Sequence, residues 1–166
     1  ADAGFGLPEL NRSEIVPARL IANPGCYPTA SILALAPLLR RGLIEATGIV
    51  IDAKSGVTGA GATAKAATHF PDLFGDFKAY ALGGHRHTPE IEETLSQLGR
   101  GRVETLFLPH LLPIDRGILA TCYARARAGV KSDEIEAAYA EDYADEPYVR
   151  WRALPPSLRC GLEGAV

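Results

Sequence analysis

A lone cysteine lies between a Pro-Gly turn and a stretch of helix formers in the segment LIANPGCYPTA, from Leu20 to Ala30. A thiol is a nucleophile only as its thiolate, and the unpaired N–H groups at a helix N-terminus favour that anion. Pro28 fits the first turn of a helix, so the pattern predicts Cys26 at the electropositive start of one. The alternative is a small buried hydrophobic side chain, which is how most free cysteines behave.

Two histidines separated by one residue form a second group, in the segment GGHRHTPE. If this segment is extended, His85 and His87 project to the same side of the chain. A neutral imidazole within reach of a cysteine can accept its proton, and the imidazolium can later protonate a developing alkoxide. The alternatives are two surface histidines or a His-x-His metal pair, although His69, His110 and the scattered acids lack the spacing of a zinc motif.

The third group is a glycine-rich run, KSGVTGAG, from Lys54 to Gly61. Glycines that follow a strand can turn backbone N–H groups toward an anion or a planar ring. The run matches neither the P-loop pattern nor the dinucleotide-binding pattern. By itself it therefore predicts no more than a turn.

The composition is that of an ordinary globular domain, with 47% hydrophobic and 22% charged residues in a chain of 166. Lysine and arginine number 17 against 20 acidic residues, and a net charge of -3 without like-charge runs argues against nucleic acid or an anionic membrane as a partner. No apolar run approaches the roughly 18 residues that span a bilayer, and the first residues lack a signal-peptide layout, so we expect a cytoplasmic protein. Cys26, Cys122 and Cys160 are odd in number and far apart, which predicts reduced thiols.

Hydrophobic periodicity and turn residues predict the elements that position these groups. Helices are expected over 28–40, with Pro37 near the last turns, over 88–99, with Thr88 as N-cap, and over 132–144, with Ser132 as N-cap. Strands are expected over 18–23, after a loop rich in Gly and Pro, and over 48–56, 78–84 and 148–153.

Two long β-rich segments, 103–114 and 117–128, are separated by the turn residues Asp115, Arg116 and Gly117. This arrangement predicts that they pair antiparallel. Together the elements predict a single α+β domain, with a mixed, largely antiparallel sheet and helices packed mainly on one face.

The run from Ile21 to Pro37 closely resembles the active-site signature of the N-acetyl-gamma-glutamyl-phosphate reductase family. Further blocks stand in the order in which this family would place them: GLPELNR, SGVTGAG, GGHRHTPEIE, PHLLPIDRGIL and YADEPYVR. Because they extend over nearly the whole chain, the resemblance is more specific than any single motif. It implies a reductase of arginine biosynthesis, similar in logic to aspartate-semialdehyde and glyceraldehyde-phosphate dehydrogenases.

By this resemblance, Cys26 attacks an acyl phosphate, NADPH reduces the resulting thioester, and the product is N-acetylglutamate semialdehyde. His87 is the expected acid/base, and His85 is expected nearer a substrate-positioning role. Oxyanion stabilisation is expected from the Cys26 N–H or from Asn23, which could equally be a turn former before proline. The remaining expected site residues are substrate-binding Asn23, Tyr80, Arg86, Glu90 and Arg116 and cofactor-binding Ser55, Gly56 and Gly59, with no metal.

Two features depart from the family pattern. The chain contains no G-x-G-x-x-G turn and ends at GLEGAV, so we expect 1–166 to be the catalytic and dimerisation domain of a longer protein, assembling as a dimer or tetramer through its sheet. The resemblance would also place a basic residue after Gly-Ala-Gly, where Ala62 stands and Lys65 is the next cation, which weighs against phosphate binding by that loop. Alternatives are a reductase of carrier-bound aminoadipyl phosphate in lysine biosynthesis, or an assembly module without activity of its own.

Overall fold

The sheet at the centre of the fold has strand order β4-β5-β3-β6, in a computed structural model that describes residues 3–63 and 65–158. β3 pairs in parallel with β5 and antiparallel with β6, and β4 pairs antiparallel with β5. The prediction of an α+β domain with a mixed, largely antiparallel sheet is therefore confirmed. The strands are β3 (Ile49–Ser55), β4 (Lys78–Ala79), β5 (Thr105–Leu111) and β6 (Ile118–Tyr123).

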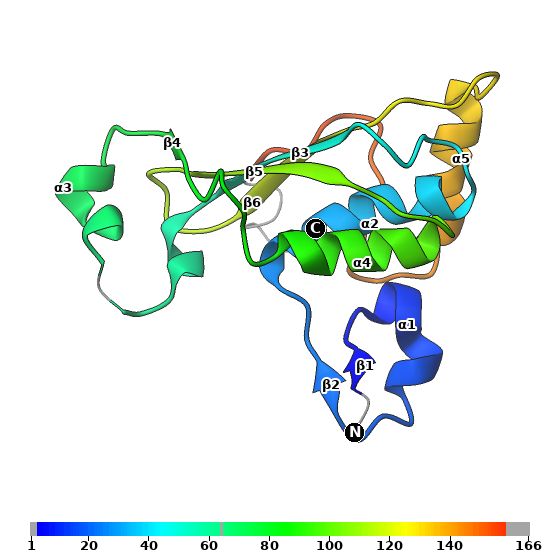
Figure 1. Cartoon of the computed structure of the whole chain (residues 1–166), viewed down its shortest axis with the longest axis horizontal. Coiled ribbons are helices and arrows are strands. Elements are labelled where there is room, and N and C mark those ends of the chain that lie inside the picture. The colour runs from blue at the N-terminus through cyan, green and yellow to red at the C-terminus, as the bar shows by residue number, and fades with distance from the viewer. Residues whose placement is uncertain (1–2, 64, 159–166) are drawn as a thin grey trace.

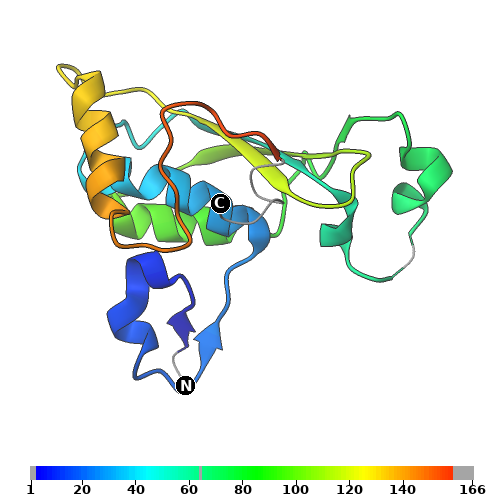
Figure 2. The same ribbon diagram turned by 180° about the vertical axis from the view of Figure 1, so that it is seen from behind.

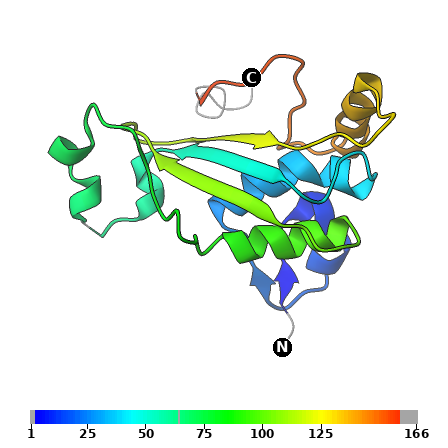
Figure 3. The ribbon, with the colours of Figure 1, turned by 45° about the horizontal axis from the view of Figure 1, so that its top comes forward.

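Two helices, α2 (Cys26–Arg40) and α4 (Thr88–Leu98), lie against one face of the sheet (Figures 1 and 3). Alternate side chains of β3 are buried beneath them, as the period of a strand requires. Within the described residues, no helix lies across the opposite face. The core that joins helices and sheet includes the fully buried Ile32, Leu35, Ile49, Ile51, Ile91 and Leu95.

The predicted antiparallel pairing of 103–114 with 117–128 is wrong, because β3 lies between β5 and β6. The two strands do run in opposite directions, but the segment that joins them crosses the end of β3. There the Leu112 N–H donates to the Ser55 carbonyl, and the Gly56 N–H donates to the Gly117 carbonyl. Alternating hydrophobicity predicts each strand separately, but it does not reveal which strand takes the central place between two others.

The first described residues form a small βαβ unit that projects from the main body (Figures 1 and 2). β1 (Gly4–Phe5) and β2 (Ile21–Ala22) pair in parallel, and α1 (Pro8–Ile15) connects them. The strand expected here is confirmed but short, whereas the expected loop before it contains a helix that the pattern did not predict. Pro8 at the first helical position and Glu9 in the first turn are the signals that identify α1.

Several predicted boundaries shift in the structure. α2 begins at Cys26 rather than at Pro28. The N-cap of α4 is His87 rather than Thr88, which becomes the first helical residue. β4 is shorter than the strand expected over 78–84, because the chain turns at Ala81 with a φ of 50°.

An arm of residues 57–77 leaves the end of β3 and returns as β4 (Figure 1). It contains the short helices η1 (Val57–Ala60), η2 (Ala66–Thr68) and α3 (Phe70–Leu73). Thr58 fastens its base, because both its N–H, at 3.0 Å, and its hydroxyl, at 2.8 Å, donate to the Asp115 carbonyl.

The strand predicted over 148–153 is wrong, since these residues follow the last helix without regular structure. Trp151 instead stacks on Tyr139, with ring centroids 4.9 Å apart and planes at 2°. The aromatic residue that suggested a strand therefore packs against a helix.

The cysteines that the structure describes, Cys26 and Cys122, are free thiols, and Cys160 lies outside the described residues. No described helix is long and apolar enough to cross a membrane.

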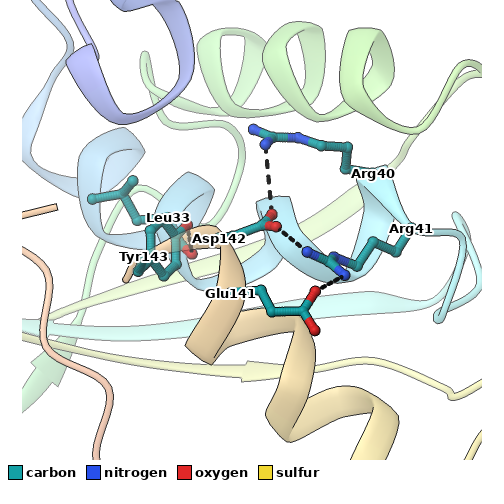
Figure 4. Close-up of polar contacts among 6 residues, drawn as sticks. All are labelled: Leu33, Arg40, Arg41, Glu141, Asp142 and Tyr143. Carbon is teal, nitrogen blue, oxygen red and sulfur yellow. Dashed lines mark hydrogen bonds and ion pairs between the residues drawn. The ribbon is translucent and has the colours of Figure 1, made fainter. Parts of the chain in front are cut away.

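Helix α5 (Ser132–Asp142) holds the C-terminal end of α2 through a group of ion pairs (Figure 4). Arg41 pairs with Asp142 and, at 2.7 Å, with Glu141, while Arg40 lies 3.5 Å from Asp142. The N-cap of α5 is Lys131 rather than the predicted Ser132.

Two tyrosines, one in α5 and one directly after its last residue, donate hydrogen bonds to the backbone of α2. The Tyr139 hydroxyl donates to the Ala34 carbonyl at 2.6 Å. The Tyr143 hydroxyl donates to the Leu33 carbonyl at 2.5 Å, and Figure 4 shows these two residues. Pro37 has no N–H, so it leaves the Leu33 carbonyl without its usual helical donor. Tyr143 supplies the missing donor, which explains how the helix continues through Pro37 to Arg40.

We expect Tyr143→Phe to lower the free energy of unfolding by about 1–3 kcal/mol, because it leaves the Leu33 carbonyl unpaired. In a Pro37→Ala background the loss should be smaller, since the new N–H can donate to the same carbonyl. Chemical denaturation of the wild type, both single variants and the double variant measures the difference. An equal loss of unfolding free energy in the wild-type and Pro37→Ala backgrounds would contradict this explanation. Tyr148→Phe is the control and should leave the free energy of unfolding unchanged, because Tyr148 is 91% exposed.

Candidate active site

A cavity of about 370 Å³ opens at the end of the sheet, where β3 ends and the arm begins. The first residues of α2 and the segment before α4 form its other walls. The cysteine, the histidine pair and the glycine-rich run therefore meet in one place, although they are far apart in the sequence. Among the expected site residues, those that line it are Cys26, Ser55, Gly56, Gly59, Tyr80, His85, Arg86 and His87.

Cys26 lies at the start of a helix, as the sequence predicted, and its thiol is exposed in the cavity. The first N–H groups of a helix have no intrahelical partner, so Cys26 lies at the positive end of the helix dipole. Gly25 is the N-cap, and its N–H donates to Oε1 of Glu90 at 3.0 Å. This bond ties the start of α2 to α4.

Gly25 also makes room for a histidine. A Cβ atom at this position would lie 2.5 Å from Nε2 of His87 and 2.8 Å from its Cε1, closer than real atoms approach. A glycine is therefore required for the His87 ring to reach the start of α2. The sequence pattern indicated only a turn at Gly25, because a close approach between distant segments leaves no local signal.

His87 is the N-cap of α4, and its side chain is only 9% exposed. Its backbone N–H donates to Nδ1 of His85 at 3.1 Å, and the two ring centroids lie 4.8 Å apart. Among the described residues, Nδ1 of His87 is buried without a hydrogen-bond partner. The described part of the chain holds no cluster of three His, Cys, Asp or Glu side chains suited to a metal ion.

The pKa values of both histidines lie below the ordinary value. Burial is the main cause in each case, and the positive charge of Arg86 lowers both pKa values further. The neighbouring His87 also lowers the pKa of His85, whereas the carboxylate of Glu90 partly offsets the shift of His87. Both rings are therefore neutral near pH 7 and able to accept a proton.

Tyr27 and Tyr80 close one side of the cavity with hydroxyl groups 2.9 Å apart. Burial raises the pKa of both phenols, so both remain protonated. The Tyr27 ring makes edge contacts with His85 at 5.7 Å and His87 at 6.0 Å between centroids. Tyr27 thus helps to fix both imidazoles, a role that its place next to Cys26 did not reveal.

Three expected site residues lie outside this cavity. Asn23 and Glu90 line a neighbouring cavity of about 710 Å³, and Arg86 lines both. Arg116 lines neither, and its Nε lies 3.7 Å from an Asp115 carboxylate oxygen.

Besides Tyr27, three polar residues of the cavity wall were not predicted as site residues. Lys65 and Thr68 come from the arm, and Lys78 is the first residue of β4, with its Nζ 3.6 Å from Asp76. The sequence gives no motif for them, because the fold of the arm determines whether they turn toward the cavity.

Comparison with known proteins identifies close sequence relatives. A family model described as "Semialdehyde dehydrogenase, dimerisation domain" matches residues 26–159. The N-acetyl-gamma-glutamyl-phosphate reductase of Desulforudis audaxviator is 54% identical over 156 residues, covering 94% of this chain and 44% of that protein. The reductase of the same name from Pelotomaculum thermopropionicum is 52% identical over 158 residues, covering 95% and 45%. The chain thus spans less than half the length of these relatives.

Solved structures show the same fold at much lower sequence identity. Aspartate semialdehyde dehydrogenase II from Vibrio cholerae has a TM-score of 0.58 and 15% identity, covering 82% of this chain and 48% of that one. A structure of the same enzyme complexed with ASA has a TM-score of 0.59 and 14% identity, covering 95% and 54%. At these identities the likeness is one of fold alone.

In an NMR titration we expect His87 to have its midpoint below 6.5, because burial disfavours the imidazolium. Glu90→Gln should move the midpoint further down, since it removes the charge that partly offsets burial but keeps an acceptor for the Gly25 N–H. An unchanged or higher midpoint would be inconsistent with this account, and Glu93→Gln, on the exposed side of α4, is the matched control. The unfolded chain binds a proton at His87 more readily than the folded protein does, because the pKa is lowered only in the folded state. The contribution of His87 to the free energy of unfolding is therefore fully present above pH 6.5 and is lost as the pH falls through the folded-state pKa.

Proposed function

Because the chain belongs to the family of semialdehyde dehydrogenase dimerisation domains, we propose that it is the catalytic and dimerisation domain of an N-acetyl-gamma-glutamyl-phosphate reductase. The reaction is the NADPH-dependent reduction of N-acetyl-L-glutamyl 5-phosphate to the 5-semialdehyde and phosphate, in the arginine biosynthesis of the cytoplasm. The observation that carries this proposal is an exposed cysteine at a helix start, in one cavity with two histidines whose pKa values are lowered.

In the first step, the Cys26 sulfur attacks the acyl carbon while a neutral histidine accepts the thiol proton. The C–S bond forms, the C–O bond to phosphate breaks, and inorganic phosphate leaves. His87 is the better candidate for the base, because its Nε2 lies against Gly25, the residue before Cys26. His85 accepts the His87 N–H, which suits it to a positioning role.

The wall formed by Ser55, Gly56 and Gly59 suits the nicotinamide end of the cofactor. A Cβ at Gly59 would meet only Ser55 Oγ, at 3.6 Å, so this part of the wall leaves room for a planar ring. NADPH, when bound, supplies the hydride that reduces the thioester. The His87 imidazolium then protonates the oxyanion and takes the proton back when the C–S bond breaks, which releases the aldehyde and restores the thiolate.

For stabilising the oxyanion, the geometry favours the Cys26 N–H over Asn23. The Asn23 side chain lines the neighbouring cavity, and its Nδ2 lies 3.5 Å from the Pro24 carbonyl. The N–H of Cys26, by contrast, belongs to the first turn of α2, where backbone donors have no helical acceptor.

The β1-α1-β2 unit supports the proposal of a longer protein. Parallel strands normally lie inside larger sheets with helices on their faces, and a pair of two-residue strands has little stability alone. Leu20 and Ile21 are 54% and 47% exposed, and the family match begins only at residue 26. We infer that the remaining strands of this sheet belong to a nucleotide-binding domain.

The sheet face opposite α2 and α4, here called the outer face, is the best candidate for the subunit interface of a dimer or tetramer. Leu106 and Tyr123 on it are 56% and 55% exposed. Near its centre, Asp52 pairs with Lys54 and with His110, whose Nδ1 lies 3.2 Å away. By register, the outer face consists of Val50, Asp52, Lys54, Leu106, Leu108, His110, Leu119, Thr121 and Tyr123.

In the full-length enzyme, we expect Cys26→Ala to reduce turnover by on the order of 10³-fold or more, because no thioester can form. Coupled spectrophotometric assays with the acyl phosphate measure the loss, and circular dichroism verifies the fold. The matched control is Cys122→Ala, since burial raises the pKa of the Cys122 thiol to about 11 and keeps it unreactive. Normal turnover in Cys26→Ala would refute the mechanism.

Leu106→Glu should convert the oligomer to a monomer. The new carboxylate would be buried without a partner when a second subunit covers the outer face, and burying an unpaired charge is costly. Sedimentation velocity measures the change in mass. Phe70→Glu, at a side chain 70% exposed in α3 of the arm, should leave the mass unchanged. An intact oligomer in the folded Leu106→Glu protein would exclude this face as the interface.

A further inference from the structure

The charges around the catalytic cavity differ in sign from those of the chain as a whole. The net charge of the chain is -3, yet the described lining of the cavity includes Lys65, Lys78 and Arg86 and no carboxylate. The neighbouring cavity, by contrast, is lined by Glu14, Glu90 and Glu93 along with Arg86. Electrostatics therefore favour an anion in the catalytic cavity and not in its neighbour.

The two lysines reach the cavity from two places along the chain, Lys65 from the middle of the arm and Lys78 from the strand that follows the arm. Lys65 is the N-cap of η2, and its carbonyl accepts the Thr68 hydroxyl at 3.1 Å. Lys78 begins β4, where it is registered with Leu111 of β5. Arg86 comes from a third segment, between the two histidines. The arm and the strand that follows it thus contribute Lys65, Thr68 and Lys78 to the lining of one cavity.

Lys65 also resolves a difficulty in the glycine-rich loop. The position after Gly-Ala-Gly is occupied by Ala62, which does not line the cavity. Lys65 does line it, together with Gly59 and Ala60 of the same loop. This part of the chain therefore does bring a cation to the cavity, but the cation is Lys65, three residues after the position where the family resemblance would place it.

We propose that Lys65, Thr68 and Lys78 form a phosphate subsite, which binds the phosphoryl group of the substrate and then the inorganic phosphate that leaves. This inference rests on the proposed function, because that reaction expels phosphate beside Cys26. As the C–O bond breaks, negative charge grows on the phosphate oxygen, and two ammonium groups stabilise it more than they stabilise the intact acyl phosphate. The ion pair of Lys78 with Asp76 is partly exposed, so phosphate can replace this carboxylate at little cost.

The substrate also carries a carboxylate, which is the competing occupant of a cationic site. Arg86 is better suited to that group, because a guanidinium binds a carboxylate through two parallel hydrogen bonds, whereas ammonium groups act as point charges. The lysines could thus bind either the phosphate or the carboxylate, and the reverse reaction separates these two assignments. In that direction the carboxylate is part of the semialdehyde, whereas inorganic phosphate is a separate substrate with a KM of its own.

The test is the reverse reaction of the full-length enzyme with semialdehyde, NADP and inorganic phosphate. Lys65→Gln and Lys78→Gln should each raise the KM for phosphate about tenfold or more, with the KM for semialdehyde unchanged. Lys131→Gln, an exposed lysine at the start of α5, is the charge-matched control and should leave both constants unchanged. Unchanged KM values for phosphate in folded variants, or a rise in the KM for semialdehyde instead, would overturn the subsite.

A second measurement separates this inference from the proposed function. Inorganic phosphate should slow alkylation of Cys26 by iodoacetamide in the wild type, and this protection should be lost in both lysine variants. If the wild type shows protection but no reductase activity, the proposed function fails and the anion subsite stands. If it shows activity but no protection, the subsite is overturned while the reductase assignment stands.

Discussion

The contact between the His87 ring and the backbone of Gly25 is the constraint on which the site depends. No side chain fits at Gly25, and its N–H donates to Glu90, which lies in the first turn of the helix that His87 caps. The starts of α2 and α4 are thus joined at one point, and the thiol of Cys26 and both imidazoles line the same cavity there. Because both helices pack on the same face of the sheet, the core that they share sets the relative positions of Cys26 and His87. A histidine on a separate loop would lack this support.

The remaining walls of the cavity depend on the end of β3. The chain that joins β5 to β6 crosses this end and accepts the N–H groups of Gly56, Val57 and Thr58. A Cβ at Gly56 would lie 2.7 Å from the backbone N of Arg116, so the crossing also requires a glycine. Arg116 therefore contributes to the end of β3 through its backbone position, while its side chain lines neither of the two cavities. The arm that begins here brings the lysines to the same cavity.

Support for the site extends to the far end of α2. Pro37 would weaken this helix if the carbonyl of Leu33 stayed unpaired, and Tyr143 prevents that. Arg41 adds ion pairs to Asp142 and Glu141, although pairs this exposed contribute little individually. The helix that presents Cys26 is therefore anchored by α4 at its start and by α5 at its end (Figures 1 and 4).

The sequence by itself determined the local features: the helix after Pro-Gly, the helix after the histidine pair, the strand before the glycine-rich run and the α+β class. These follow from proline, glycine and hydrophobic periodicity, which act over a few residues. Only the tertiary structure decided that β3 separates β5 from β6, that Trp151 packs on a helix instead of forming a strand, and that Lys65 and Lys78 line the same cavity as Cys26. Those outcomes depend on which buried surfaces fit together and on contacts between segments far apart in the chain. Such contacts leave no periodic pattern in the residues that make them.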